Sequence, residues 1–329
     1  MKLIDSDVTI LYSRLLEQLI DDAAEGIPSY GSLVNKKVKE KLYWYHQYRF
    51  LGKQLQKSIG VDKPAEEWKA ALEEREKLCA ILMAGGMVSF PPKSQITNVL
   101  GLLISASVFD TGAVLIGSHA FGAICNMLGI RVDTQLTTTQ DIDFGIDRNI
   151  QVAGVDLSFE KTLLDAGMLA IPGLDLPPTA TSFKSRDRKV KVDFLTPAKS
   201  RASTGKPVRL RQHGVHADQL KYLDYLIEAP VQAALITKLG MLVTVPQPAH
   251  FAFHKLIVAT QRDVTRDAKR KKDIAQASLL LNYLVKQRPH DIEPAWNALV
   301  RKGWEKEISR GFSMADPSLF FSLQDYLIE

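Results

Sequence analysis

The feature that most restricts the fold of this chain is a set of apolar strand patterns that carry carboxylates on one side. Asp141 and Asp143 flank Ile142, and Asp193 lies within the β-branched run 189–195. Successive side chains of a strand point to opposite faces, so Asp141 and Asp143 share one face while Ile142 points to the other. Such strands belong in a sheet with a covered core on one side and a polar site on the other.

A short apolar run, 113–116, ends in Gly117-Ser118, and a helical pattern then continues to Leu128. Glycine lets the backbone turn sharply and approach a phosphate, and the amides at the start of the helix can donate to phosphate oxygens. The pair is equally compatible with an ordinary tight turn in which Ser118 caps the helix.

The three acids suit divalent cations that are bound together with a phosphorylated substrate. Mg²⁺ prefers oxygen ligands and is usually held by one or two carboxylates plus substrate phosphates. Asp141, Asp143 and Asp193 supply enough oxygens for two ions roughly 3.5–4 Å apart, as in-line phosphoryl displacement requires. The alternative is that Asp141 and Asp143 form the solvated face of an edge strand.

The remaining patterns predict an α/β (α+β) fold, a small mixed sheet flanked by helical regions. We place boundaries that give a helical N-terminal region (1–92), an α/β core (93–247) and a helical C-terminal region (248–329). Helices are expected at about 6–25, 36–58, 64–84, 94–107, 118–128, 157–166, 249–261, 267–287 and 291–309, with a final turn or two after Pro317. Strands are expected at 113–116, 141–146, 180–185, 189–195, 225–228 and 241–245.

The composition is that of an ordinary globular protein with a mild excess of positive charge. The chain has 329 residues, of which 46% are hydrophobic and 24% charged. No run approaches the roughly 20 apolar residues of a membrane span, and the N-terminus lacks a signal-peptide core. Cys79 and Cys125 do not make a disulfide framework, so we expect a cytoplasmic protein without a membrane partner. The net charge of +5 mildly favours a polyanionic partner.

Two further patterns each allow two interpretations. Residues 43–50 read YWYHQYRF and are flanked by lysines, which suits either a surface that stacks the bases of single-stranded RNA or a helix that packs its aromatic rings inward. His250 and His254 have the spacing of metal ligands on a helix, but no glutamate lies between them. We therefore expect core or capping histidines.

The sequence GSHAFGAICNMLG, followed by TTTQDIDF and a distal strand aspartate, resembles the motif of the DNA polymerase β-like nucleotidyltransferase superfamily. The local sequence is most similar to that of bacterial stand-alone nucleotidyltransferases of the AbiEii/MenT toxin type, over about residues 110–275. The resemblance implies that Gly117 and Ser118 bind the triphosphate of an NTP. It also implies that the aspartate pair holds two Mg²⁺ ions, for which Mn²⁺ can substitute, and that Asp193 is the third ligand.

Further along, HFAFHKLIVATQRDVTRDAKRKKDIAQA resembles the helical Lys…Arg…Lys-Asp motif of the AbiEii group. That match implies that Lys255 reaches the nucleotide phosphates, with Arg262, Lys272 and Asp273 around the site. The alternative to this resemblance is that Lys255 and Arg262, which are two helical turns apart, form a solvated basic face of the helix. The segment between Ser118 and the aspartate pair is longer than is usual in the superfamily.

Taken together, these features predict a Mg²⁺-dependent nucleotidyltransferase of the EC 2.7.7 type. It would move an NMP from an NTP such as ATP to an acceptor hydroxyl, with release of pyrophosphate. The first expectation for the acceptor is the 3′ end of a tRNA; a protein or a small molecule is the alternative. A non-catalytic protein that binds nucleotides or nucleic acid on the same scaffold is the alternative of a different class. The toxin-type resemblance also implies an antitoxin-like partner.

Overall fold

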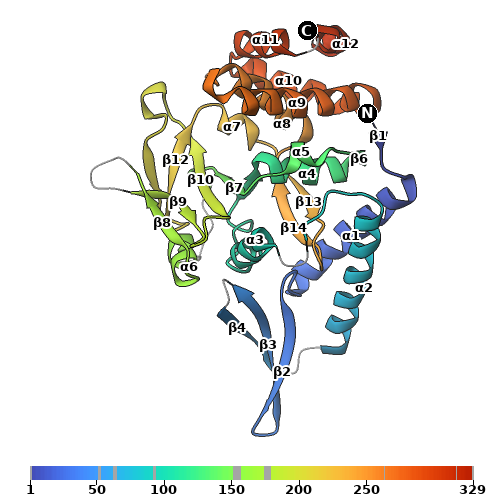
Figure 1. Cartoon of the computed structure of the whole chain (residues 1–329), viewed down its shortest axis with the longest axis vertical. Coiled ribbons are helices and arrows are strands. Elements are labelled where there is room, and N and C mark those ends of the chain that lie inside the picture. Colours follow the sequence, from blue (N-terminus) through green and yellow to red (C-terminus); the bar gives the residue numbers. More distant parts are fainter. Residues whose placement is uncertain are drawn as a thin grey trace.

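A mixed sheet occupies the middle of the molecule, and helices from both ends of the chain lie beside it (Figure 1). The computed structural model describes residues 2–50, 53–61, 65–91, 94–150, 157–173, 179–262, 264–315 and 317–327. Within these residues the fold is α+β, as predicted. None of the helices in this part of the chain combines the length and the apolar character that crossing a bilayer requires.

The central sheet is built around two parallel strands, β7 (Asp141–Ile146) and β10 (Lys191–Pro197). On one side, β5 (Ala113–Ile116) pairs antiparallel with β7. On the other, β10 pairs with β9 (Ala180–Lys184) near its start and with β12 (Val215–Leu220) near its end. The remaining strands are β8 (Leu169–Pro172) beside β9, and β11 (Pro207–Leu210) beside β12.

Alternation along β7 and β10 separates the core from the polar face. Ile142 and Phe144 of β7 are buried, as are Val192 and Phe194 of β10. The rings of Phe144 and Phe194 stack with centroids 5.8 Å apart. This packing fixes the register of the two strands and therefore leaves their aspartates together on the opposite face.

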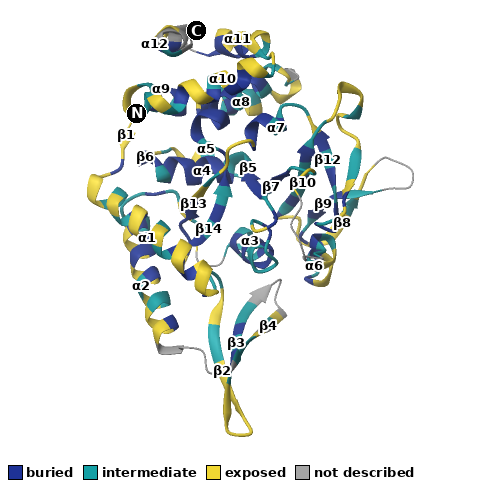
Figure 2. Ribbon diagram, turned by 180° about the vertical axis from the view of Figure 1, so that it is seen from behind, coloured by how far each residue is buried: buried dark blue, intermediate teal, exposed yellow. Residues whose placement is uncertain are grey.

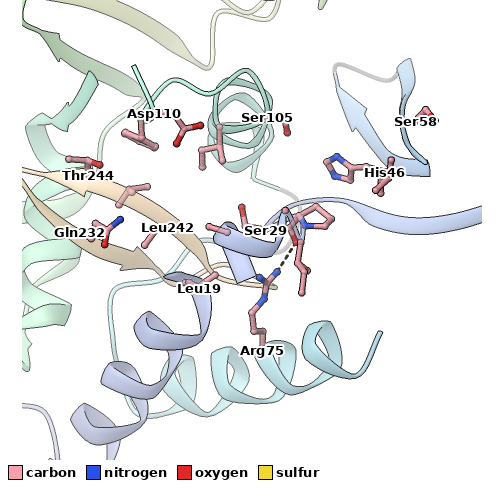
Figure 3. A pocket seen from close by; sticks show the side chains of 18 residues that line it. Leu19, Ser29, His46, Ser58, Arg75, Ser105, Asp110, Gln232, Leu242 and Thr244 are labelled. Carbon is pink, nitrogen blue, oxygen red and sulfur yellow. Dashed lines mark hydrogen bonds between the residues drawn. The ribbon is translucent and has the colours of Figure 1, made fainter. Parts of the chain in front are cut away.

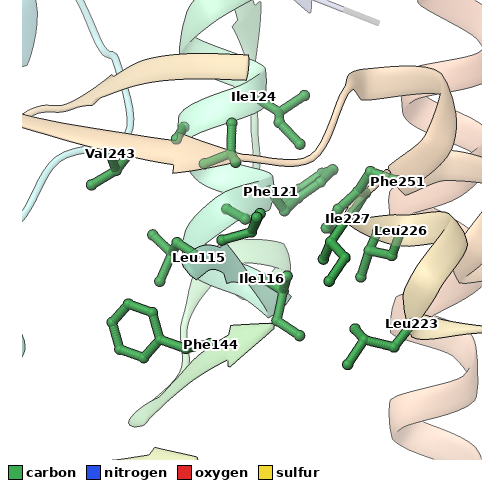
Figure 4. Packing of buried hydrophobic residues seen from close by; sticks show 14 of the residues in the cluster. Leu115, Ile116, Phe121, Ile124, Phe144, Leu223, Leu226, Ile227, Val243 and Phe251 are labelled. Carbon is green, nitrogen blue, oxygen red and sulfur yellow. The ribbon is translucent and has the colours of Figure 1, made fainter. Parts of the chain in front are cut away.

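The C-terminal helices belong to the same hydrophobic core as the sheet. Figure 4 shows Phe121 beside Phe251, with Leu115 of β5 and Leu226 in the same cluster. The rings of Phe121 and Phe251 stack 6.0 Å apart. The helices of this core are α3 (Gln95–Ser105), α4 (Gly117–Met127), α6 (Phe159–Asp165), α7 (Leu223–Leu226), α8 (Pro248–Thr260), α9 (Asp267–Gln287), α10 (Ile292–Arg301), α11 (Glu305–Met314) and α12 (Pro317–Leu327).

Two predicted elements of this half of the chain need correction. The strand expected at 225–228 is wrong, because Leu223–Leu226 form a helical turn; a short apolar run does not distinguish a strand from a buried helical turn. The helix expected at 291–309 is divided into α10 and α11, with Gly303 between them at φ +70°.

The N-terminal helices cover a separate β-hairpin. Helices α1 (Ser6–Glu25) and α2 (Ala65–Ala84) form a second hydrophobic cluster with β13 (Val231–Leu235) and its neighbouring residues. β13 pairs with β14 (Met241–Val245). Strand β1 (Lys2–Leu3) pairs with β6 (Ile130–Arg131). The boundary expected at residue 92 lies outside the described residues, and the division into three regions stays a prediction.

The helix expected at 36–58 is wrong. This segment forms an antiparallel sheet of β2 (Ser32–Val38), β3 (Lys41–Phe50) and β4 (Lys53–Val61), which we call the basic arm. Lys39 and Glu40 connect β2 to β3 with φ of +47° and +64°. Positive φ at both central residues is what a two-residue hairpin turn requires, usually with asparagine or glycine. Neither residue is one of those, so the turn was not recognised.

Candidate active site

Asp143 lies at the centre of the candidate site, between Asp193 and the turn that begins α4. The β7–β10 register pairs Asp143 with Asp193, and the β5–β7 register pairs Asp143 with Ile116. Gly117 follows at φ +72°, and a Cβ there would lie 2.6 Å from Asp143 Oδ2. Both the backbone conformation and the close approach of the carboxylate therefore require glycine at this position.

The carboxylate of Asp143 is buried beside two other carboxylates, those of Asp193 and Asp141, which gives the site an excess of negative charge. Removal from water raises its pKa to about 7, and the charges of Asp193 and Asp141 act in the same direction. The ammonium groups of Lys255 and Lys191 oppose this rise without cancelling it. A bound divalent cation would neutralise this surplus and reverse the preference for the protonated form.

Asp193 is held by neighbours on the sheet. Lys191 Nζ lies 2.7 Å from its carboxylate, and the Ser182 hydroxyl donates a hydrogen bond to it. As the described side chains stand, they contain no group of three or more His, Cys, Asp or Glu arranged to hold a metal ion. The donors still suit a divalent metal ion, because the hard carboxylate oxygens of Asp143 and Asp193 lie on adjacent strands. The ammonium group of Lys191 is the counter-ion of Asp193.

A pocket of about 480 Å³ opens beside Asp143 and Gly117. Part of its wall comes from α8 and the residues that follow it, which contribute His254, Lys255 and Arg262. The other lining residues are largely apolar or cationic: Ile116, Leu195, Thr204, Leu220, Lys221, Tyr222, Leu223, Leu226, Phe251, Val258, Gln261 and Arg266. A pocket with apolar walls and convergent cations next to carboxylates suits a nucleotide bound through its phosphates.

Asp273 of α9 fixes the two cations of this wall. Lys255 Nζ lies 2.8 Å from Asp273 Oδ1, and Arg262 donates to the second carboxylate oxygen. Burial raises the pKa of Asp273, but Lys255 and Arg262 outweigh that effect and hold the pKa below its usual value. The structure thus brings Gly117, Asp143, Lys255 and Arg262 to one pocket, with Asp273 behind the two cations.

Ser118 and Lys272 face a different region. Ser118 lines a second pocket of about 470 Å³, together with His119 and residues 137–139 of the long segment before β7. Lys272 Nζ donates to the Thr138 carbonyl oxygen at 3.0 Å. This segment, which includes α5 (Thr134–Thr137), therefore docks on α9. Burial, with a smaller effect of Lys272, lowers the pKa of His119 to about 4.

The two helical histidines have different surroundings. His250 is a core residue, as expected: it stacks on Tyr225 with ring centroids 4.5 Å apart, and its Nδ1 lies 2.8 Å from the Tyr225 carbonyl oxygen. His254 borders the larger pocket, and burial lowers its pKa to about 3. Both rings are consequently neutral at physiological pH.

Sequence reasoning missed several residues of the site. Lys191 carried a usable signal, because it precedes Asp193 by two positions and so shares its strand face. Ser182 pairs with Asp193 across β9 and β10, which only the strand pairing reveals. Tyr222 reaches the pocket from a segment that carries no motif, and Arg266 lies within 250–277 but is not one of the motif positions named above.

Comparison with known proteins gives one family. A family model described as a nucleotidyltransferase matches residues 94–301, which is more than half of the chain. The matched span runs from the residue before α3 to the end of α10 and contains the aspartate strands and the pocket wall. No curated protein and no solved structure matches the chain significantly.

Proposed function

Since the chain belongs to the nucleotidyltransferase family, we propose that it moves an NMP from an NTP to an acceptor hydroxyl and releases pyrophosphate. The observation that carries this proposal is the pocket that joins Asp143 and the Gly117 turn to Lys255 and Arg262. The pocket brings the Asp143 carboxylate together with two cations, and Asp193 pairs with Asp143 on the adjacent strand, which is what a metal-bound triphosphate needs.

In this proposal Asp141, Asp143 and Asp193 hold two Mg²⁺ ions, or Mn²⁺ in their place. When bound, these ions would neutralise the triphosphate and the charge that develops during transfer. The amides at the start of α4 donate to phosphate oxygens, as helix N-termini do. Lys255 and Arg262, which line the same pocket, bind the phosphates.

Asp193 acts on the acceptor. Its carboxylate accepts the proton of the attacking hydroxyl, whose oxygen forms a new bond to the α-phosphorus. The bond from the α-phosphorus to the pyrophosphate oxygen breaks, and pyrophosphate leaves with the electron pair. Lys191 and Ser182 position Asp193 for this role through the contacts described above. Most of the rate enhancement would then come from positioning and charge neutralisation.

The acceptor in this proposal is an RNA 3′-hydroxyl, with tRNA as the first candidate. The positive net charge of the chain supports a polyanionic acceptor. The closer likeness to toxin-type enzymes, and with it an antitoxin-like partner, stays a prediction.

The experiment incubates the protein with each α-labelled NTP and Mg²⁺, and with either total RNA or cell protein as acceptor. We expect label on RNA together with released pyrophosphate. Asp141→Asn and Asp143→Asn should each lower the rate by roughly 10²–10³-fold or more, because each removes a charge that stabilises the transition state. Asp165→Asn, at an exposed position on α6, is the matched control and should leave the rate unchanged.

Full activity in the Asp141→Asn/Asp143→Asn double variant would refute the mechanism. Label on protein instead of RNA would refute RNA as the acceptor but would still support nucleotidyl transfer as the reaction. NTP binding that is indifferent to Mg²⁺, without transfer to any acceptor, would instead support the non-catalytic alternative.

A further inference from the structure

The basic arm carries the positive charge excess of the whole chain. The sequence contains 42 Lys and Arg against 37 Asp and Glu. Residues 32–61 account for seven of these bases and one of these acids. The rest of the chain is therefore close to neutral, with 35 bases and 36 acids. A charge distribution this uneven marks one surface for a polyanion.

The arm extends away from the body of the molecule. Figure 1 shows β2, β3 and β4 at the end opposite the C-terminal helices, and Figure 2 shows β2 and the β2–β3 turn as mostly exposed. The lysines near the turn are exposed: Lys36, Lys37, Lys39 and Lys41. Lys36 and Lys37 lie on β2, Lys39 lies in the turn and Lys41 begins β3. Because these exposed lysines surround the tip of the hairpin, a flexible polyanion can reach all of them without a change in the fold.

The two faces of β3 differ in chemistry. Trp44 and His46 are buried on the inner face, while Tyr43 and Tyr45 alternate with them and remain partly exposed on the outer face. Lys36 pairs across the strands with Tyr43 and places its Nζ 5.2 Å from the centroid of the Tyr45 ring. The outer face therefore combines the rings of Tyr43 and Tyr45 with Lys36 and Lys41, while Lys37 pairs with Leu42 on the other face of the exposed tip.

Hydrogen bonds from a buried side chain hold the root of the arm. The buried guanidinium of Arg75 donates to Asp22 at 2.9 Å and to the Pro28 carbonyl oxygen at 2.8 Å, which ties α2 to α1 and to the segment that leads into β2. Figure 3 shows the hydrogen bond from Arg75 to the Pro28 carbonyl oxygen, beside a pocket of about 390 Å³ between the arm and the body. Tyr48 anchors the inner face by packing on Tyr30, with ring centroids 5.3 Å apart.

We propose that the outer face of the basic arm binds a single-stranded polynucleotide, with phosphates on its lysines and bases stacked on Tyr43 and Tyr45. Aromatic rings that alternate with cations are the recurrent way to bind unpaired nucleotides, since every base has a face to stack and every linkage a charge to neutralise. The identification of this polynucleotide as the acceptor rests on the proposed function; the binding itself does not.

The test measures the anisotropy of labelled oligo(U) and oligo(dT) of about 20 nucleotides, enough to cover a surface of this type. NTP is left out and EDTA is present, so that the catalytic site does not contribute. Replacing Lys36, Lys37, Lys39 and Lys41 with alanine together should weaken binding roughly 10- to 100-fold and lower the salt slope of log Kd by about 2–3. Tyr43→Ser/Tyr45→Ser should weaken binding roughly tenfold or more and leave the salt slope unchanged. Tighter binding of one of the two probes identifies RNA or DNA as the natural ligand.

The matched control removes four exposed lysines from helices elsewhere: Lys69, Lys77, Lys161 and Lys286. It lowers the net charge equally and should leave the affinity nearly unchanged. Equal weakening by both quadruple variants would overturn the proposal, because net charge alone would then explain the binding. Binding to phosphatidylserine vesicles without binding to either oligonucleotide would also overturn it.

The two proposals fail separately. Asp143→Asn should abolish transfer and bind oligo(U) as tightly as the natural sequence. If the arm variants bind normally while Asp143→Asn abolishes transfer, the arm proposal falls and the catalytic one stands. If the arm variants lose binding while no transfer occurs with any NTP, only the catalytic proposal falls.

Discussion

At the scale of single residues, Asp143 couples the stability of the metal-free protein to pH. Its pKa is about 7 in the folded chain and near 4 in an unfolded one. Between these values the folded state keeps a proton that the unfolded state has released. The free energy of unfolding therefore falls as pH rises from about 4 to about 7, and above that the penalty stays constant.

We expect Asp143→Asn to raise the free energy of unfolding in EDTA at pH 8 by roughly 2–4 kcal/mol, because the amide has no charge to bury. Near pH 4 the gain should be small, since Asp143 is protonated there in the folded state. Urea unfolding at the two pH values measures both quantities, and Asp165→Asn is the exposed control. An equal gain at both pH values would show that the charge of Asp143 is not the cause.

Gly117 gives a second prediction. Gly117→Ala adds a methyl group 2.6 Å from Asp143 Oδ2, so the carboxylate must move. We expect the transfer rate to fall roughly 100-fold, as when a reacting group is misplaced by an ångström. Gly303→Ala is the matched control, since its φ of +70° carries the same backbone strain with nothing within 4 Å of the new methyl group. Its transfer rate should stay unchanged; an equal loss in both variants would assign the effect to strain.

The sequence allowed the residues of the site to be identified only where local spacing carries information. Asp141 and Asp143 are two positions apart, and Gly117 directly follows an apolar strand pattern, so short-range rules apply to each. Ser182 touches Asp193 only because β9 returns beside β10. That pairing depends on the whole sheet, and no local pattern encodes it.

At the scale of elements, the errors occurred where turn chemistry was unusual or where an apolar run was short. The basic arm was mistaken for a helix because Lys39 and Glu40 form its first turn without glycine or asparagine. The alternation of buried Trp44 and His46 with Tyr43 and Tyr45 is a period of two, which favoured a strand. In contrast, α9 is long, and its predicted bounds agree with the structure.

Two ion pairs between α1 and α2 should differ sharply in their contribution to stability. Arg75→Met removes a fully buried guanidinium and leaves the Asp22 carboxylate without it, which should cost about 3–5 kcal/mol. Arg14→Met breaks the pair with Glu74. The side chains of Arg14 and Glu74 are 62% and 46% exposed, so this loss should cost less than about 1 kcal/mol. Urea unfolding of the two variants tests this. Similar losses would show that helix packing, and not the buried pair, holds the arm's root.

At the scale of the whole molecule, the sheet and the C-terminal helices form one hydrophobic cluster that runs from α3 to α12. A fragment that ends at residue 247 lacks α8, and with it Phe251, on which Phe121 stacks. We expect this fragment to show no cooperative thermal transition by circular dichroism, whereas the full chain does. A sharp transition in the fragment would establish the core as an independent folding unit.

The position of the basic arm has a consequence for selectivity by size. Figure 1 shows the arm at one end of the molecule and α7 and α8, which contribute residues to the pocket beside Asp143, on the other side of the central sheet. A polymer that contacts both the arm and the pocket binds the second site intramolecularly and therefore with higher overall affinity, as a bivalent ligand does. A polymer too short to reach both sites has no such gain in affinity. Turnover at a fixed low concentration should therefore rise abruptly once the acceptor is long enough to span the protein. The enzyme would then select acceptors by their length, because only long acceptors bind the arm and the pocket together.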